Sequence, residues 1–331
     1  PPRPLRSSAW AQGPRERGHI RAIAALGLDD KMVQPLTARR ALLRHGAVAS
    51  LALAGLPARA APIVLHDALG RRVVLPAPPQ RIVTIFSSNT ELVVALGMLD
   101  RIVGVEDFTR FPAEVARIAK VGGRLGFSAD AVVAQQPDLV IVTPARQAAH
   151  QLVAPMERIG VPILVLLSRS LAEVLGNVRL IAQAGGVSGR GEALAASLQA
   201  RLAQVDARVA GRTPPRMLML TGRLGSGMLL VARADTYTGE AMLRAGGRFA
   251  LAGGGAVPQV SPEAVLAADP DVLLFAGSEE ALRDLVAQPG WRGMRAVRAG
   301  RAATVSRSEF LIPGPRTVDG VEKLARWLHP A

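Results

Sequence analysis

The chain has 331 residues, of which 49% are hydrophobic, and carries a formal net charge of +14 at pH 7 with no cysteine. A chain of this length can bury a large core, and its length favours two domains. Without cysteine it forms neither disulfides nor a lipid-modified cysteine anchor. Aromatic residues make up only 3% of the chain, whereas nucleic-acid surfaces combine clustered basic residues with stacking rings. We therefore expect no nucleic-acid partner and no membrane anchor.

The first 60 residues have the composition of a targeting leader. Residues 1–31 precede the first methionine, Met32, and their Pro- and Arg-rich sequence predicts a non-native upstream extension. Residues 32–60 predict a secretory signal peptide, with a basic start, an apolar stretch at Ala47–Leu56 and an A-x-A cleavage site ending at Ala60. The apolar stretch is too short to span a bilayer.

The export route is left open by the pair Arg39-Arg40, which resembles a twin-arginine signal but also fits a general secretory signal. Removal of residues 1–60 leaves 30 basic and 23 acidic residues, a net charge of +7. We expect a free periplasmic protein, and a monomer.

One stretch of sequence occurs twice, with a spacing of 133 residues from Ser128 to Ser261. The first copy reads SADAVVAQQPDLVIV and the second SPEAVLAADPDVLLF. In each, Ser is a good N-cap, an acid (Asp130 or Glu263) suits the positive helix end, and Pro-Asp ends the helix. The apolar run that follows suits a strand buried on both faces. The repeat predicts two α/β lobes of similar build.

The amino-terminal lobe is predicted over residues 61–187. Strands alternate with helices, which indicates a parallel sheet with helices on both faces. We expect a capping box of Ser88 and Glu91 at the start of the first helix. The predicted elements are a hairpin at 63–79, strands at 81–86, 102–105 and 160–166, and helices at 88–97 and 171–184.

A long helix is predicted at 188–209, within a connecting segment 188–212, because its apolar residues recur every three or four positions. The carboxy-terminal lobe is predicted over residues 213–331. Its expected elements are a strand at 217–220, a glycine-rich strand-to-helix turn at 221–227, a helix at 238–245, a late strand at 297–305 and a closing helix at 317–328. The fold class is α/β, with two Rossmann-like lobes bridged by one long helix.

Enzyme motifs are sparse in this sequence. It has no cysteine nucleophile, no G-x-S-x-G elbow and no H-E-x-x-H helix. Beyond the predicted leader the only histidines are His66, His150 and His329, which lack the spacing of a bare-metal site. Asp107, Glu309 and His150 are the only general acids or bases that we can name for an exported enzyme acting on an anionic substrate.

Arginine is frequent where predicted strands end, which is where α/β sheets bind ligands. Guanidinium groups hold carboxylates, phosphates and anionic chelates. Among the six candidates we favour Arg146, Arg223 and Arg316; the others are Arg124, Arg169 and Arg307.

Several motifs in order resemble the periplasmic substrate-binding proteins of the iron-chelate, haem and cobalamin class. They are RIVTIFSSNTELVVALG at 81–97, the strand at 102–105, residues 134–142, the long helix, and Gly314-Pro315-Arg316. The resemblance covers roughly residues 64–329. It implies two lobes on a rigid helix, a ligand between them, and delivery to an ABC permease dimer driven by a cytoplasmic ATPase. It implies no resident cofactor, since the metal chelate is cargo.

The resemblance also assigns residues. In this family one acid on each lobe pairs with permease arginines, and the matching positions are Asp130 and Glu263, although the family usually has Glu at both. The candidate ligand-binding residues are Ser87, Ser88, Asn89, Phe108, Arg146, Arg223, Tyr237 and Arg316.

The ligand is predicted from departures from the family. Cobalamin binders line the cleft with rings, whereas the corresponding positions here are Phe108, Arg124, Thr143, Thr221 and Val257. Haem binders commonly supply a tyrosine from the loop at 108–112, which here has none. These departures favour an anionic ferric siderophore, with cobalamin or haem as alternatives. A ligand-sensing partner of a membrane receptor would share the same fold.

Overall fold

The computed structural model describes residues 61–123, 126–143, 148–251 and 259–330. The predicted extension at 1–31, the signal peptide at 32–60, and Arg124, Arg146 and Val257 lie outside these residues. Residues 60–331 form one unit whose described residues contain a five-stranded sheet, a six-stranded sheet and two small two-stranded sheets. No helix in the described ranges combines the length and apolar character needed to cross a membrane.

The first sheet is entirely parallel, with the strand order β5-β4-β3-β8-β9. Every residue of its two central strands, β3 and β8, is buried, as the continuous apolar runs predict. An antiparallel hairpin precedes it and turns at Gly70, whose φ of 74° favours glycine. The strands are β1 (Ile63–His66), β2 (Arg72–Leu75), β3 (Ile82–Ile85), β4 (Ile102–Val105), β5 (Ala119–Lys120), the short pair β6 (Gly122–Gly123) and β7 (Gly126–Phe127), β8 (Leu139–Val142) and β9 (Ile163–Val165).

Helices cover both faces of this sheet. On one face Ile82 and Ile141 pack with residues of α2 and α5, and on the other Val83 packs with residues of α3 and α4. This confirms the predicted two-sided layering. The helices are α2 (Ser87–Ala95), α3 (Ala129–Ala134), α4 (Ala148–Arg158) and α5 (Leu171–Ala184), with 3-10 turns at Leu99–Arg101 and Ala113–Arg117.

The second sheet is mixed rather than parallel throughout. β10 pairs in parallel with β12 and β14, and β14 with β15, but β11 and β13 add an antiparallel edge. The expected strand-to-helix turn at 221–227 is therefore wrong: β10 runs on to Arg223 and folds back as a hairpin. The strands are β10 (Arg216–Arg223), β11 (Leu229–Val231), β12 (Arg248–Phe249), β13 (Gln259–Val260), β14 (Val272–Phe275) and β15 (Ala302–Thr304).

The second sheet is also packed on both faces, by one cluster that includes Met217 and Leu324 and another that includes Leu218 and Trp291. The late strand predicted at 297–305 is shorter, because a turn of helix occupies its first residues. The helices are α7 (Tyr237–Arg244), α8 (Pro262–Ala268), α9 (Glu279–Val286), α10 (Arg295–Arg298), α11 (Arg307–Phe310) and α12 (Pro315–Leu328), with a 3-10 turn at Trp291–Gly293.

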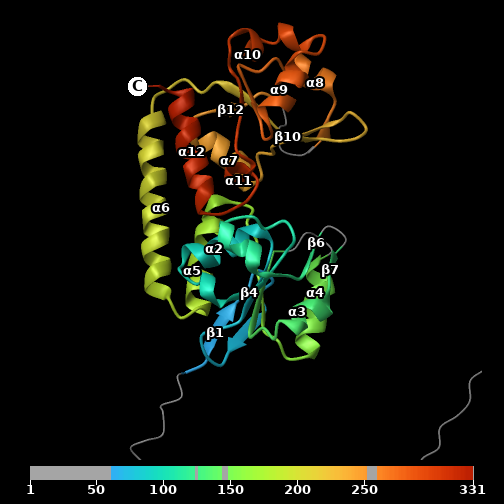
Figure 1. The fold of residues 1–331 in the computed structure, drawn as a ribbon. Coiled ribbons are helices and arrows are strands. Elements are labelled where there is room, and N and C mark those ends of the chain that lie inside the picture. The colour runs from blue at the N-terminus through green and yellow to red at the C-terminus, as the bar shows by residue number, and fades with distance from the viewer. Residues whose placement is uncertain (1–60, 124–125, 144–147, 252–258, 331) are drawn as a thin grey trace, which may run out of the picture. The chain divides into compact units, whose positions relative to one another are not determined.

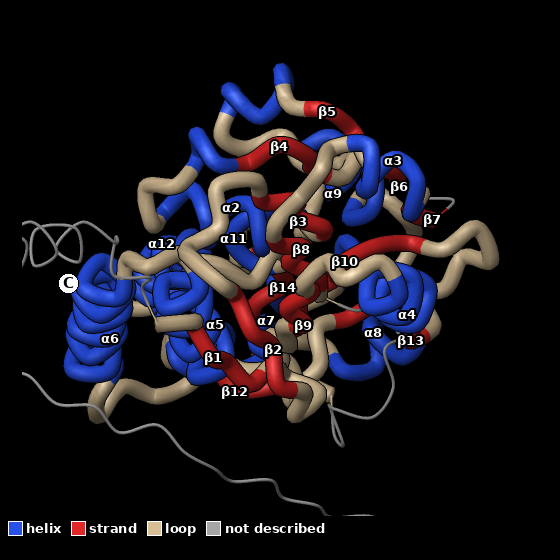
Figure 2. The backbone as a smooth tube through the Cα atoms, turned by 90° about the horizontal axis from the view of Figure 1, so that it is seen from below, coloured by secondary structure: helices blue, strands red, loops and turns tan. Residues whose placement is uncertain are grey.

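The long helix α6 (Ser188–Val209) has the predicted bounds and runs alongside both lobes (Figure 1). Ala195 belongs to the core of the first lobe, whereas Leu198 and Leu202 belong to that of the second. Leu171 at the start of α5 also packs into the second core. The α/β class with two lobes bridged by one helix is thus confirmed, and the tube view shows α5 and α6 side by side (Figure 2).

The repeated stretch forms the same unit twice. Ser128 accepts a hydrogen bond from a backbone N–H at the start of α3, and Ser261 does the same for α8. After each helix one residue is left-handed, Gln136 with φ 48° and Asp269 with φ 38°. The strands that follow, β8 and β14, pair with β3 and β10. The sequence repeat is therefore a structural repeat.

The Pro-Asp pairs of the repeat join each helix to the neighbouring strand. Asp138 accepts a hydrogen bond from the backbone N–H of Arg81 at 2.9 Å, and Asp271 accepts one from that of Arg216 at 2.9 Å. Both arginine side chains then donate to backbone carbonyls where the helix ends. These carbonyls have no partner within the helix, so the arginines satisfy them.

Candidate functional site

The carboxyl end of β3 carries the predicted serine–asparagine motif. Ser88 and Asn89 are almost fully buried, with 1% of each residue exposed. Asn89 donates to the backbone carbonyl of Ile85 at 2.6 Å and accepts from Thr143, which follows β8, at 3.1 Å. Ser88 Oγ has no hydrogen-bond partner within the described part of the chain. Asn89 therefore links the carboxyl ends of β3 and β8 through hydrogen bonds, which is a structural role.

The predicted capping box of Ser88 and Glu91 does not form. The N-cap of α2 is Phe86, whose φ of 87° is unusual for a bulky residue, and no side chain caps the helix. Strained backbone of this kind is often found at functional sites. Glu91 is instead directed away from the helix end, to a partner in the other lobe.

Glu91 pairs with Arg316, the second residue of α12. Arg316 Nε donates to Glu91 Oε2 at 2.9 Å, and its Nη2 donates to the other carboxylate oxygen. The Glu91 side chain is only 3% exposed, and burial raises the pKa of its carboxyl, an effect that Arg316 partly offsets. Arg316 was predicted to bind ligand, but its guanidinium is engaged by this bidentate pair between the lobes.

Two phenylalanines lie exposed after β4. Phe108 is 54% exposed and Phe111 is 47% exposed, and the peptide bond between Phe111 and Pro112 is cis. The guanidinium of Arg316 lies over the Phe111 ring, 4.2 Å from its centroid. The sequence singled out Phe108, whereas the structure adds Phe111 and a neighbouring cation.

A buried carboxylate beside them was missed by the sequence reasoning. Glu106 is 7% exposed, and its Oε1 accepts a hydrogen bond from Ser87 Oγ at 2.8 Å. Thr109 Oγ1, also buried, lies 3.5 Å from the same oxygen. The Ser87 hydroxyl is thus already bound within the protein. The one signal in the sequence was an acid immediately after a buried strand.

The second lobe presents Arg223 at the last position of β10. Its exposed side chain is absent from the ion pairs found among the described residues. Arg307 behaves differently, because it donates to the carbonyls of Thr221 and Ala276 at 3.0 Å each. Of the predicted arginines with described positions, Arg223 is therefore the one best placed to meet an anion.

Tyr237 begins α7 and is half-buried. Burial strongly raises the pKa of its phenol, against the smaller effect of a hydrogen bond with Thr238. The structure therefore agrees with a packing role for Tyr237.

The segment from α11 to α12 connects the two strand edges. Arg307 contacts the carboxyl ends of β10 and β14, and nine residues later Arg316 contacts α2, which begins at the carboxyl end of β3. A second contact between the lobes joins the Leu171 N–H to the Glu240 carboxylate at 2.7 Å. Arg223 and the exposed phenylalanines consequently lie on the carboxyl edges of the two sheets, and the segment from α11 to α12 contacts both edges.

The two predicted docking acids occupy matched positions. Asp130 lies in the first turn of α3 and Glu263 in the first turn of α8, and both are exposed. A hydrogen bond with Ser261 lowers the pKa of Glu263, so this carboxylate is charged at neutral pH. Neither acid takes part in an ion pair within the described ranges, and both complement the dipoles of their helices.

The described residues contain no group of three or more His, Asp or Glu side chains that could hold a metal ion. His66 lies in β1, and His329 is buried with Nε2 3.0 Å from the Gly246 carbonyl. The side chain of His150 and the residues Arg124 and Arg146 lie outside what the structure describes. The described geometry thus presents rings and an arginine rather than a metal centre.

The fold of two α/β lobes on one long helix, with exposed acids at matched helix starts, defines a class of binding protein. The chain belongs to the periplasmic binding protein family, whose model matches residues 82–307. The predicted resemblance to substrate-binding proteins of ABC importers is thereby confirmed. The family consists of binding proteins rather than enzymes.

Particular relatives sharpen this assignment. The chain is 25% identical to the uncharacterized ABC transporter substrate-binding lipoprotein YvrC of Bacillus subtilis, over 81% of this chain and 86% of that protein. It is 25% identical to the vitamin B12-binding protein of Vibrio parahaemolyticus, over 74% and 87% respectively. Among solved structures it is similar to the periplasmic heme-binding protein RhuT of Roseiflexus sp. RS-1, with 31% identity, a TM-score of 0.66, and 74% and 96% coverage.

Proposed function

We propose that this protein captures an anionic metal chelate between its two lobes in the periplasm and delivers it, as a monomer, to an ABC permease dimer with a cytoplasmic ATPase. The observation that carries the proposal is that the carboxyl edges of the two sheets expose different kinds of side chain. One lobe exposes Phe108 and Phe111, and the other presents the exposed Arg223. An apolar, flat ligand with acidic groups suits this combination.

Haem is the chelate that this chemistry favours. Its macrocycle would stack on the exposed rings, and its propionates would pair with arginine, as guanidinium groups commonly do with carboxylates. The relative with 31% identity is named a heme-binding protein, which supports the same choice. Tyr237 has no part in this proposal, because its phenol is half-buried.

A ferric carboxylate siderophore is the second candidate. It was the preferred ligand from the sequence, where arginines outnumber rings. Arg223 supports it equally well, because a carboxylate-rich chelate needs a cation more than it needs a stacking surface. Cobalamin is named for a 25% identical relative, but its single phosphodiester anion offers Arg223 less negative charge than the two propionates of haem.

The test is calorimetric titration of the purified protein with haemin, a ferric carboxylate siderophore and cyanocobalamin under identical conditions. We expect tight 1:1 binding of haemin, with the ligand recovered chemically unchanged. Tight binding of the siderophore alone would move the proposal to the second candidate. Failure of all three, or turnover of a bound chelate, would overturn it.

A further inference from the structure

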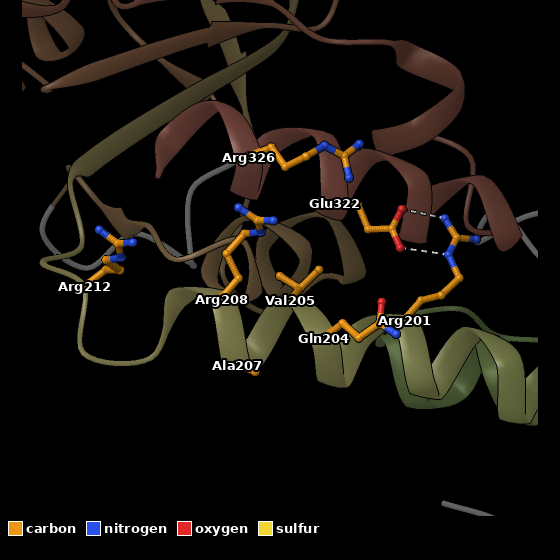
Figure 3. A pocket seen from close by; sticks show the side chains of 8 residues that line it. All are labelled: Arg201, Gln204, Val205, Ala207, Arg208, Arg212, Glu322 and Arg326. Carbon is orange, nitrogen blue, oxygen red and sulfur yellow. Dashed lines mark hydrogen bonds and ion pairs between the residues drawn. The ribbon is translucent and has the colours of Figure 1, made fainter. Parts of the chain in front are cut away.

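A hollow lined with arginines lies on the surface between α6 and α12, on a different side of the protein from the docking acids. Its volume is about 440 Å³, and its charged lining consists of Arg201, Arg208, Arg212, Arg326 and Glu322. Figure 3 shows these side chains around the carboxy-terminal half of α6. Figures 1 and 2 both place α6 opposite α3 and α8, which carry the acids.

The arginines of this hollow are unequally partnered. Arg201 donates two hydrogen bonds of 2.8 Å to the Glu322 carboxylate and another to Asp319. Arg208, Arg212 and Arg326 have no carboxylate within 4.0 Å among the described residues. Arg201 lowers the pKa of Glu322 most, and Arg326 lowers it as well, so this one acid is shared within the lining. Four arginines and one glutamate therefore leave the hollow with an excess of positive charge.

Other arginines around α6 do have partners. Arg244 binds both carboxylate oxygens of Asp206, and Arg179 pairs with Glu192 at 2.9 Å. Arg190, by contrast, donates only to the backbone carbonyls of Leu96 and Gly97 among the residues that the structure describes. The hollow differs from these places because several guanidinium groups line it together, and like charges gathered in one place repel one another.

Helix dipoles account for only part of the cluster. Arg208 and Arg326 lie in the last turns of α6 and α12, where a cation is favourable. Arg212 lies beyond α6, after Gly211, whose φ of 72° turns the chain. The dipoles do not explain why this third arginine also lines the hollow.

We propose that the hollow binds a phosphate-bearing anion through Arg208, Arg212 and Arg326. Guanidinium groups bind phosphate oxygens in bidentate pairs, and a group with two or more negative charges would relieve the repulsion among the three cations. The phosphate belongs either to a small soluble molecule or to an anionic lipid headgroup. This site is separate from the chelate site and does not depend on the identity of the chelate.

The first arm of the test is calorimetric titration of the purified protein with inorganic pyrophosphate at constant ionic strength. The second is flotation with cardiolipin vesicles, whose headgroup carries two phosphates, compared with phosphatidylcholine vesicles. Binding in the first arm identifies a soluble phosphate, and binding in the second alone identifies a lipid headgroup. Absence of binding in both arms at about 1 mM phosphate would overturn the proposal.

Variants distinguish binding at a specific site from non-specific attraction to the positively charged protein. The triple variant Arg208→Gln, Arg212→Gln, Arg326→Gln should weaken binding at least about tenfold. The control Arg283→Gln, Arg292→Gln, Arg298→Gln removes the same charge from exposed positions outside the hollow and should leave binding unchanged. If both triple variants weakened binding equally, the attraction would be non-specific and the proposed site would be refuted.

A single variant keeps the test interpretable if the triple variant folds poorly. Arg212→Gln lies outside the helices, so it should leave the thermal unfolding temperature unchanged. It should nevertheless weaken pyrophosphate or vesicle binding by about threefold or more. Unchanged binding in this folded variant would contradict the assignment of Arg212.

Discussion

The two lobes share one internal framework but have different edges. In both, a serine caps the repeated helix, an aspartate binds the start of the neighbouring strand, and an arginine satisfies the helix-end carbonyls. At the carboxyl edge one lobe instead exposes phenylalanines, whereas the other extends β10 into a hairpin that carries Arg223. The shared parts maintain the fold, and the parts that differ are those to which we assign ligand recognition.

The same comparison explains why the second sheet is mixed. β4 has four residues and accompanies β3, whereas its counterpart β12 has two and pairs only with the first residues of β10. The later residues of β10 are therefore available to pair with β11. The short β12 thus leaves room for a hairpin at the carboxyl edge of the second sheet.

The largest effect is expected from removing the matched acids together. Asp130→Ala with Glu263→Ala should reduce uptake of the labelled chelate to background, because both lobes then lose their charge for docking on the permease. Ligand affinity should stay unchanged, since both side chains are exposed at helix starts. Uptake in cells and calorimetry on the purified variant measure the two effects.

A matched control exists on α9. Glu279→Ala with Glu280→Ala removes two exposed acids from another helix start and should leave uptake unaltered. If affinity fell together with uptake in the Asp130 and Glu263 variant, the docking role would be wrong.

The next largest effect concerns the ion pair between the lobes. Arg316→Met leaves the buried Glu91 without its partner, which should lower the free energy of unfolding by about 2 to 3 kcal/mol at pH 8. Because the pKa of Glu91 is raised above its ordinary value of 4.5, its protonated form is favoured in the folded state. The destabilisation should therefore be small at pH 4 and grow as the pH rises.

Denaturant unfolding at several pH values measures this dependence. Lys323→Met breaks the more exposed pair with Glu309 and should cost at most about 1 kcal/mol, with little change across the same range. A pH-independent loss for Arg316→Met would mean that Glu91 does not control the contact.

A smaller effect should distinguish the two capping arginines. Arg216 is half-buried and donates to three carbonyls, so Arg216→Met should cost about 2 kcal/mol. Arg81 is exposed and donates to two, so Arg81→Met should cost about 1 kcal/mol. Urea unfolding of both variants checks the order. The opposite order would show that burial does not set the strength of these caps.

The smallest effect should be the same in both copies. Ser128→Ala and Ser261→Ala each remove one N-cap hydrogen bond and should cost about 1 kcal/mol. Thermal unfolding of the two single variants measures this. Losses that differ by more than about 1 kcal/mol would indicate that the repeated units are not energetically equivalent.

Local patterns predicted much of the fold. The helices at 171–184 and 188–209 were predicted with the observed bounds, because regular apolar spacing ends in the pair Gly185-Gly186. Strands buried on both faces were found as continuous apolar runs. The hairpin of β10 and β11 was missed because its glycine-rich turn also fits a strand-to-helix connection, and pairing decides between them.

The candidate site was less predictable. Glu91 reads locally as a capping residue, but its partner Arg316 is 225 positions away. No pattern in the sequence records a contact at that distance. Arg307 likewise reads as a free cation, and only the fold shows that it binds strand-end carbonyls. Side chains at strand ends can thus be located from sequence, whereas their partners cannot.

The most direct test of the account is to measure the affinity for haemin of two kinds of variant. One kind changes a side chain at the carboxyl edges of the sheets, and the other changes a residue of the repeated unit that both lobes share. Phe108→Ala and Arg223→Gln should each raise the Kd at least about tenfold, whereas Glu263→Ala should leave it unchanged. Leu243→Ala and Arg292→Gln, at exposed positions elsewhere, are the matched controls and should have no effect. If Phe108→Ala and Arg223→Gln left the Kd within about twofold of the parent, the carboxyl edges would not form the ligand site.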